Sequence, residues 1–173
     1  MRLTLHTDYA LRTLIYLGLR ADRRTAIHEI AAAYRISENH LVKIVHKLGR
    51  GGFIETIRGR GGGLMLARPP AQIRIGDVVR HTEDDMALVG CMQQGRDDDM
   101  RACVLANACR LQGLFGDALA AFMAVLDRQT LADLLTERER TRLQARLAPD
   151  HPGRQIQPLA DPPGDHDHDR SEG

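Results

Sequence analysis

Residues 26–66, with the sequence AIHEIAAAYRISENHLVKIVHKLGRGGFIETIRGRGGGLML, decide the fold. They contain two patterns in which apolar side chains recur at the i, i+3, i+4 and i+7 spacing of an α-helix. The patterns comprise Ile27, Ile30, Ala31 and Tyr34, and then Leu41, Ile44, Val45 and Leu48. Ser37 precedes the second pattern as a helix N-cap. Two apolar runs around the glycine-rich turn 58–63 predict a hairpin. This order predicts a mainly α protein with a winged helix-turn-helix domain.

The polar side of the second helix and the tip of the hairpin are the candidate DNA contacts. With the apolar side turned to the core, the other side presents hydrogen-bond donors and positive charge suited to a major groove. Glycines let the hairpin tip approach a sugar-phosphate backbone, where arginines pair with phosphates. The alternative interpretation is a flexible surface turn. The predicted DNA-binding residues are Ser37, Asn39, His40, Lys43, Lys47, Arg58 and Arg60.

The net charge of +1 conceals two regions of opposite sign. Residues 1–75 hold 13 Lys and Arg against 5 Asp and Glu, whereas residues 76–173 hold 11 against 18. A basic region suits a polyanion such as double-stranded DNA. We therefore expect the winged helix-turn-helix domain over residues 1–75. A connecting helix, a cysteine loop and dimerisation helices should occupy residues 76–147. The Pro, Gly, Asp and His content of residues 148–173 predicts a disordered tail.

The composition also bears on the class of protein. No apolar run reaches membrane-spanning length, and the first residues lack the apolar core of a signal peptide, which predicts a cytoplasmic protein without a membrane partner. Neither a Cys/His pair at catalytic spacing nor a phosphate-binding loop occurs in the sequence, so we expect no enzyme. A thiol or zinc enzyme is one alternative. A structural DNA-packaging protein is another, although it has no need of clustered thiolates.

All three cysteines lie in one irregular stretch. Eleven residues separate Cys91 from Cys103, and five separate Cys103 from Cys109. An odd number cannot close a disulfide framework, and the tight pairs that usually mark zinc sites are absent from the sequence. Loose spacing of soft ligands suits an iron–sulfur cluster, with zinc and structural cysteines as the alternatives. For His166 and His168 in the tail, a solvated tail is favoured over a weak metal site.

Two further helices are predicted outside residues 26–66. Thr7 is a candidate N-cap for an apolar helix over residues 9–19. Asp8 lies in the first turn of that helix, and the local sequence explains it by a favourable interaction with the helix dipole. From Arg110 a long helix carries one apolar stripe that needs a partner. We favour pairing with a second subunit, which suits palindromic DNA. The stripe comprises Leu111, Leu114, Phe115, Ala118, Phe122, Val125 and Leu126.

Several short motifs occur together in a recognisable combination. They are TDYALR at 7–12, NHLVKI at 39–44, RGRGGG at 58–63, IRIGDVV at 73–79 and ACRL at 108–111. On these motifs the chain resembles the NsrR family of nitric-oxide-sensing repressors within the Rrf2 superfamily, which also contains the iron–sulfur regulator IscR. The resemblance covers about residues 1–140. It implies a homodimeric repressor with one cluster per subunit, whose nitrosylation releases a DNA operator and derepresses nitrosative-stress genes.

The resemblance also implies a set of cluster ligands. Cys91, Cys103 and Cys109 would supply thiolates, and Asp8 would supply a carboxylate from the partner subunit to a 4Fe-4S cluster. A regulator of iron–sulfur supply or redox state with a 2Fe-2S cluster is the alternative. The chain departs from the family in one respect, because the gap between its first two cysteines is unusually long and carries an acidic insert at residues 96–99.

Overall fold

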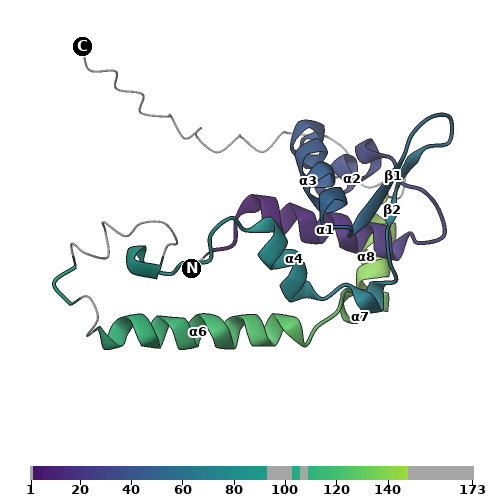
Figure 1. Ribbon diagram of the computed structural model, residues 1–173. Coiled ribbons are helices and arrows are strands. Elements are labelled where there is room, and N and C mark those ends of the chain that lie inside the picture. Colours follow the sequence, from purple (N-terminus) through teal and green to yellow (C-terminus); the bar gives the residue numbers. More distant parts are fainter. Residues whose placement is uncertain (1, 93–102, 106–108, 148–173) are drawn as a thin grey trace, which may run out of the picture.

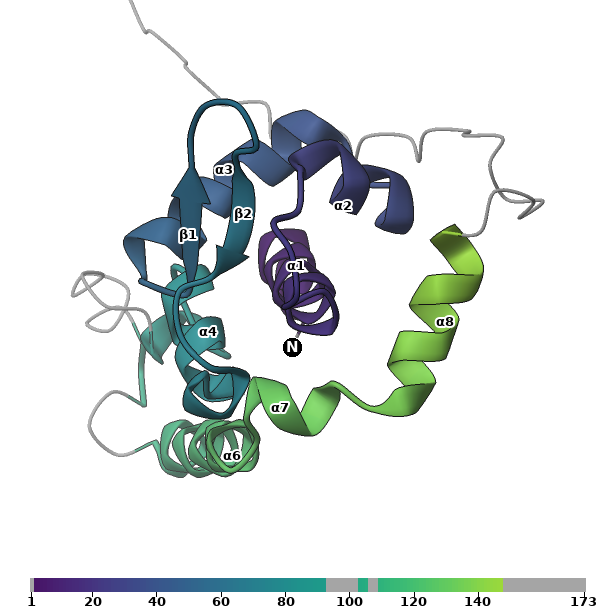
Figure 2. The ribbon, with the colours of Figure 1, turned by 90° about the vertical axis from the view of Figure 1, so that its right-hand side faces the viewer.

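A computed structural model describes residues 2–92, 103–105 and 109–147 of this chain. The acidic insert at residues 96–99 and the predicted tail at 148–173, with the metal candidates His166 and His168, lie outside the described residues. We use "body" for α1–α4, the hairpin, α7 and α8, and "arm" for the cysteine-bearing segments together with α6 (Figures 1 and 2).

Helix α1, Leu5–Leu19, lies at the centre of the body. Ala10, Leu14 and Leu17 are buried along it, so the helix supplies the main apolar surface on which the others pack. Its N-cap is Thr4, whose hydroxyl accepts a hydrogen bond from the Thr7 N–H at 3.3 Å. The prediction that Thr7 caps this helix was therefore wrong. The extended residue of the pair is Thr4, and Thr7 is buried in the first turn of the helix.

The helix-turn-helix prediction is confirmed. Helix α2, Ile27–Tyr34, ends at Arg35, which adopts the left-handed conformation with φ of 56°. Ser37 then caps helix α3, Glu38–Arg50, by accepting from the His40 N–H at 3.3 Å. The connection between the two helices is short, and Ile36 within it is buried in the core.

The wing is a two-stranded antiparallel hairpin, as predicted. Strand β1, Ile54–Ile57, pairs with strand β2, Gly63–Leu66. Thr25 extends the pairing on the other side of β2, since its N–H and C=O both bond Leu64, at 3.0 and 2.8 Å. A Cβ at Gly62 would lie 2.3 Å from the Ile57 carbonyl oxygen, so the turn requires glycine at this position.

The body is completed by segments from beyond residue 75. Helix α4, Ile75–Thr82, packs against α1, and the 3₁₀ turn η1, Pro70–Gln72, precedes it. After the arm, α7, Leu131–Leu134, and α8, Glu137–Leu147, return to the body. Leu131 is fully buried and Leu143 nearly so, both in the same core as α1. Segments on both sides of residue 75 therefore share one core, and the predicted division into domains stays a prediction.

The arm consists of the 3₁₀ turn η2, Gly90–Met92, the short described segment 103–105, Cys109 and α6, Arg110–Asp127. Figure 1 shows α6 extending from beneath α4 past the edge of the body. Within the described parts of the chain, none of the helices combines the length and hydropathy needed to cross a bilayer.

Candidate DNA-reading surface and cysteine site

Helix α3 presents the predicted reading residues to solvent. Its apolar side is buried in the core, which fixes the rotation of the helix and leaves Asn39, His40 and Lys43 exposed on the other side. The Ser37 hydroxyl is engaged as the N-cap, so its first role is to orient the start of the helix. Residues in this first part of a recognition helix are those that reach base edges.

Sequence reasoning missed one exposed residue on this helix. Val42 is 53% exposed although it is β-branched and apolar. The signal was available, because Val42 does not belong to the i, i+3, i+4 series that faces the core. A methyl-bearing side chain among polar neighbours on a reading helix matches the C5-methyl group of thymine.

The wing presents Arg58 and Arg60 at its tip, and both are exposed. The turn between them and β2 is held by Arg24, whose Nη1 donates to the Gly61 carbonyl at 2.9 Å. Both ribbon views place the wing tip and α3 at the same end of the molecule. Arg24 is a supporting residue that the sequence did not reveal, because it precedes its partner by 37 residues.

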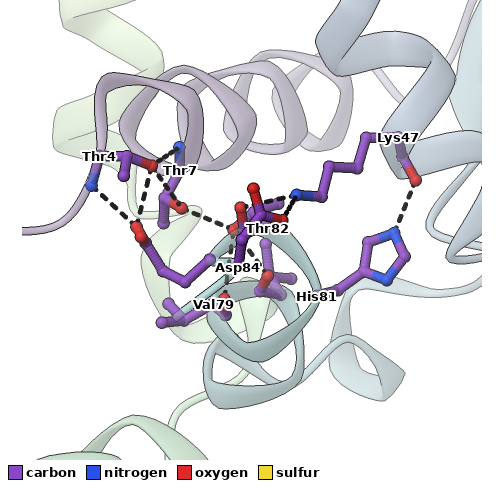
Figure 3. Close-up of polar contacts among 9 residues, drawn as sticks. Thr4, Thr7, Lys47, Val79, His81, Thr82 and Asp84 are labelled. Carbon is purple, nitrogen blue, oxygen red and sulfur yellow. Dashed lines mark hydrogen bonds and ion pairs between the residues drawn. The ribbon is translucent and has the colours of Figure 1, made fainter. Parts of the chain in front are cut away.

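Lys47 differs from the other predicted DNA contacts. Its side chain is only 27% exposed, and its Nζ donates to the Thr82 carbonyl at 3.0 Å and to Asp84 Oδ1 at 2.7 Å. Figure 3 shows the side chain directed toward the end of α4. The ammonium is therefore already bonded within the chain, and the predicted DNA contact of Lys47 stays a prediction.

The cysteines lie at the N-terminal end of the arm and carry free thiols. Cys91 lies in η2, and Cys109 is the N-cap of α6. Gln112 Nε2 donates to the Cys91 carbonyl at 3.4 Å, which places the Cys91 turn against the first turn of α6. Cys103 is exposed. Within the described residues, no three His, Cys, Asp or Glu side chains converge closely enough for a metal. The donor types nevertheless fit an iron–sulfur cluster chemically, since the three cysteines form no disulfide and offer soft sulfur ligands, and Cys91 and Cys109 both lie near the start of α6.

Asp8 does not join the thiols within one chain. Its carboxylate accepts from Arg12 Nε at 3.0 Å and pairs with Arg12 Nη2 at 2.8 Å, one helical turn away. The side chain is 41% exposed, so it remains accessible to a second subunit. Its predicted role as a ligand supplied across a dimer is not tested by the single chain.

Comparison with known proteins identifies the family. The profile of the Rrf2 family, described as an iron-dependent transcriptional regulator, matches residues 3–137. The chain belongs to the Rrf2 family. Over 139 residues it is 52% identical to the transcriptional regulator NsrR of Geobacillus kaustophilus, an alignment that covers 80% of this chain and 92% of the relative. It is 46% identical over 140 residues to NsrR of Bacillus subtilis, covering 80% and 93% of the two chains.

Solved structures agree with this assignment. CymR, the global cysteine regulator of B. subtilis, superposes with a TM-score of 0.60 at 26% identity, covering 78% of this chain and 96% of CymR. IscR of T. potens gives a TM-score of 0.64 at 22% identity, covering 82% and 90%, which shows a shared fold. This Rrf2 protein is therefore a DNA-binding transcriptional regulator of the NsrR type and not an enzyme.

Proposed function

We propose that this Rrf2 regulator is a cytoplasmic, homodimeric repressor that senses nitric oxide through an iron–sulfur cluster, 4Fe-4S rather than 2Fe-2S. The observation that carries the proposal is the presence of three free thiols between α4 and α6 along a chain so similar to NsrR proteins. Cys91, Cys103 and Cys109 would hold the cluster, with Asp8 of the partner subunit as the fourth ligand. When bound, the cluster supplies irons that react with nitric oxide.

The contacts of Asp8 support a role as the releasable ligand. A carboxylate is a harder and weaker ligand for such iron than a thiolate. In the single chain the carboxylate is paired with Arg12, so Asp8 has a protein partner whenever it is not bound to iron. Its release would break the tie between the cysteine segment of one subunit and α1 of the other. The two reading helices would then lose their relative spacing, and with it their affinity for DNA.

The exposed apolar side of α6 supports the dimer. None of its side chains is buried, and Leu111, Leu114 and Val125 are each more than half exposed. An apolar stripe along a helix of this length requires a partner. A two-fold axis along paired α6 helices would present two α3 helices to the half-sites of a palindromic operator, with the wings on the flanking backbone.

Native mass spectrometry of anaerobically purified protein, before and after a few equivalents of nitric oxide, tests the proposal because it counts irons, sulfides and subunits together. We expect a dimer with one 4Fe-4S cluster per subunit that becomes nitrosylated. Cys103→Ser serves as the cluster-deficient control. A 2Fe-2S dimer would favour a regulator of iron–sulfur supply or redox state. Zinc, or no metal, would remove the nitric-oxide signal and leave the DNA-reading surface.

Asp8→Ala tests the coupling separately. We expect weaker DNA binding by the cluster-loaded variant and a smaller loss of binding on exposure to nitric oxide. Unchanged DNA affinity together with an unchanged nitric-oxide response would contradict the role given to Asp8.

A further inference from the structure

The end of α4 is bonded to two other helices of the body, α1 and α3. We call residues 81–84, which are the last two residues of α4 and the two that follow, the α4 junction. Polar bonds connect it to the last turns of α3 and to the first turn of α1 (Figure 3). The same chain continues from the junction to Cys91 in η2.

On the side of α3, three hydrogen bonds hold the junction to a single residue, Lys47, which donates two of them and accepts the third. The Lys47 ammonium donates to the carbonyl of Thr82 at 3.0 Å and to the carboxylate of Asp84 at 2.7 Å. Because Thr82 is the last residue of α4, its carbonyl has no partner within the helix, and a cation there is also favoured by the helix dipole. In return, His81 Nε2 lies 2.7 Å from the Lys47 carbonyl and must donate, because a carbonyl only accepts.

On the side of α1, the bonds are buried or involve a charged group. The Thr7 hydroxyl donates to the Thr82 hydroxyl at 2.8 Å, and Thr82 in turn donates to the Val78 carbonyl at 2.9 Å. Thr7 and Thr82 are almost completely buried. The Glu83 carboxylate accepts from the Thr4 N–H at 2.8 Å, where negative charge is favoured at the start of α1. The junction is therefore fixed to the centre of the body, and Lys47 fixes α3 to the junction.

A role in binding phosphate would require Lys47 to abandon these bonds. The last turn of a recognition helix is also farther from the groove than its first residues. The hydrogen bond from Lys47 holds the pKa of Asp84 below its ordinary value, so the carboxylate remains a charged partner. Lys43, one turn earlier, is exposed and lies nearer the start of the helix.

We propose that Lys47 is a positioning residue of the reading helix, which it holds at its angle to α4 through Thr82 and Asp84, and that it does not contact DNA phosphate. The proposal rests on α3 being the DNA-reading helix of the proposed function. It assigns to Asp84, an acidic residue, a favourable role in binding a polyanion.

The sign of the effect at Asp84 provides the first test. The probe is a labelled duplex that the wild-type protein selects from a random-sequence pool. Removing a negative charge near DNA should tighten binding if only the charge matters. Positioning predicts that Asp84→Asn weakens binding by about three- to fivefold, which is the upper part of the range of an exposed ion pair. Asp85→Asn is the matched control, because it removes the same charge while Asn keeps the acceptor for the Ala87 N–H. Equal or tighter binding by Asp84→Asn would overturn the proposal.

The salt dependence of binding provides the second test. A lysine that contacts a phosphate contributes about one unit to the slope of log affinity against log salt. We expect Lys47→Met to weaken binding about three- to fivefold at an unchanged slope. Lys43→Met, the matched control, should reduce the slope by about one. A loss of about one unit in Lys47→Met would identify a phosphate contact and overturn the proposal.

A measurement without DNA separates this proposal from the proposed function. If the wild-type protein selects no duplex, the proposed function fails, but the tie between α3 and α4 can still be tested by hydrogen exchange. We expect the backbone amides of residues 47–51 to exchange faster in Asp84→Asn than in Asp85→Asn. Equal exchange in the two variants would show that Asp84 does not hold the end of α3, and would overturn the positioning role.

Discussion

Helices α3 and α6 show how differently the two regions of this protein are stabilised. Helix α3 buries Leu41, Ile44, Val45 and Leu48 within its own chain, whereas the longer α6 buries no side chain. Most helical stability in proteins comes from packing of an apolar side, so α3 obtains its stability from the body. The described residues of one chain do not supply the surface that would bury the apolar side of α6. The candidate DNA-reading part is therefore packed within a single subunit, and we propose that a second subunit completes the arm.

The polar groups follow the same division. In the body, Arg24, Lys47 and Thr82 bond partners far away in sequence and fix the elements relative to one another. In the arm, the three thiols are free, and Cys91 and Cys109 lie near the start of α6. When a well-packed DNA-reading body lies next to a candidate cysteine site, a ligand at that site can change the relative position of two subunits without unfolding either of them.

The largest expected effect tests whether the body is stable by itself. Leu41→Ala removes a fully buried side chain from the core, and we expect the free energy of unfolding to fall by about 2–5 kcal/mol because a cavity remains. Leu114→Asp on the arm, where Leu114 is 61% exposed, should leave the circular dichroism spectrum unchanged and convert dimer to monomer. Urea denaturation and sedimentation velocity measure the two outcomes.

Ala120→Asp is the matched control for the arm. It adds the same charge to an exposed position on α6 that lies outside the apolar stripe by helical spacing. We expect it to remain dimeric. Dissociation by both α6 substitutions, or by neither, would contradict the assignment of this stripe to the subunit interface.

The next prediction tests whether α3 recognises bases while the wing contacts the DNA backbone. Asn39→Ala and Val42→Ala should each cost about 1–3 kcal/mol at particular base pairs and relax sequence preference there. Arg58→Ala and Arg60→Ala should weaken binding to many sequences by similar factors, since a phosphate contact carries no sequence information. Binding measured against single-base variants of the selected duplex separates the two patterns. A uniform loss for all four changes would show that α3 and the wing do not differ in this way.

The smallest effect concerns a polar contact of the body. Glu29 accepts from the Ala26 N–H at 2.9 Å and pairs with Arg23, and the Arg23 hydrogen bond lowers the pKa of Glu29 below its ordinary value of 4.5. A carboxylate with a lower pKa in the folded than in the unfolded state stabilises the protein at pH values above its unfolded pKa. This contribution to stability is lost as the pH falls through the folded pKa. Glu29→Gln should therefore be less stable than the wild type at pH 7, by under about 1 kcal/mol.

Denaturation at several pH values gives the check on Glu29. The difference between Glu29→Gln and the wild type should shrink as the pH falls below 4.5, because the wild-type carboxylate then becomes protonated. A difference that stays constant with pH would show that the charge of Glu29 contributes nothing. In either case the effect should remain well below that of Leu41→Ala, which would confirm that apolar burial dominates the body.

The sequence by itself determined the local features of this protein. The helix-turn-helix, the Ser37 cap, the hairpin and the start of α6 at Arg110 all follow from patterns within a few residues, because helical spacing and caps act over one or two turns. The apolar stripe of α6 and the two regions of opposite charge could also be recognised from the sequence alone. The family resemblance rested on the same short motifs, and the similarity to NsrR proteins confirms it.

Only the tertiary structure decided which distant groups meet. Thr7 bonds Thr82 across 75 positions, Lys47 bonds Asp84 across 37, and Leu131 returns to the core of a domain predicted to end at residue 75. No local pattern encodes such pairs, because they depend on how separately predictable helices pack against one another. For this reason the sequence placed Lys47 with the DNA contacts by its charge and its helical spacing, whereas the packing of α3 against α4 turned its ammonium inward to the α4 junction.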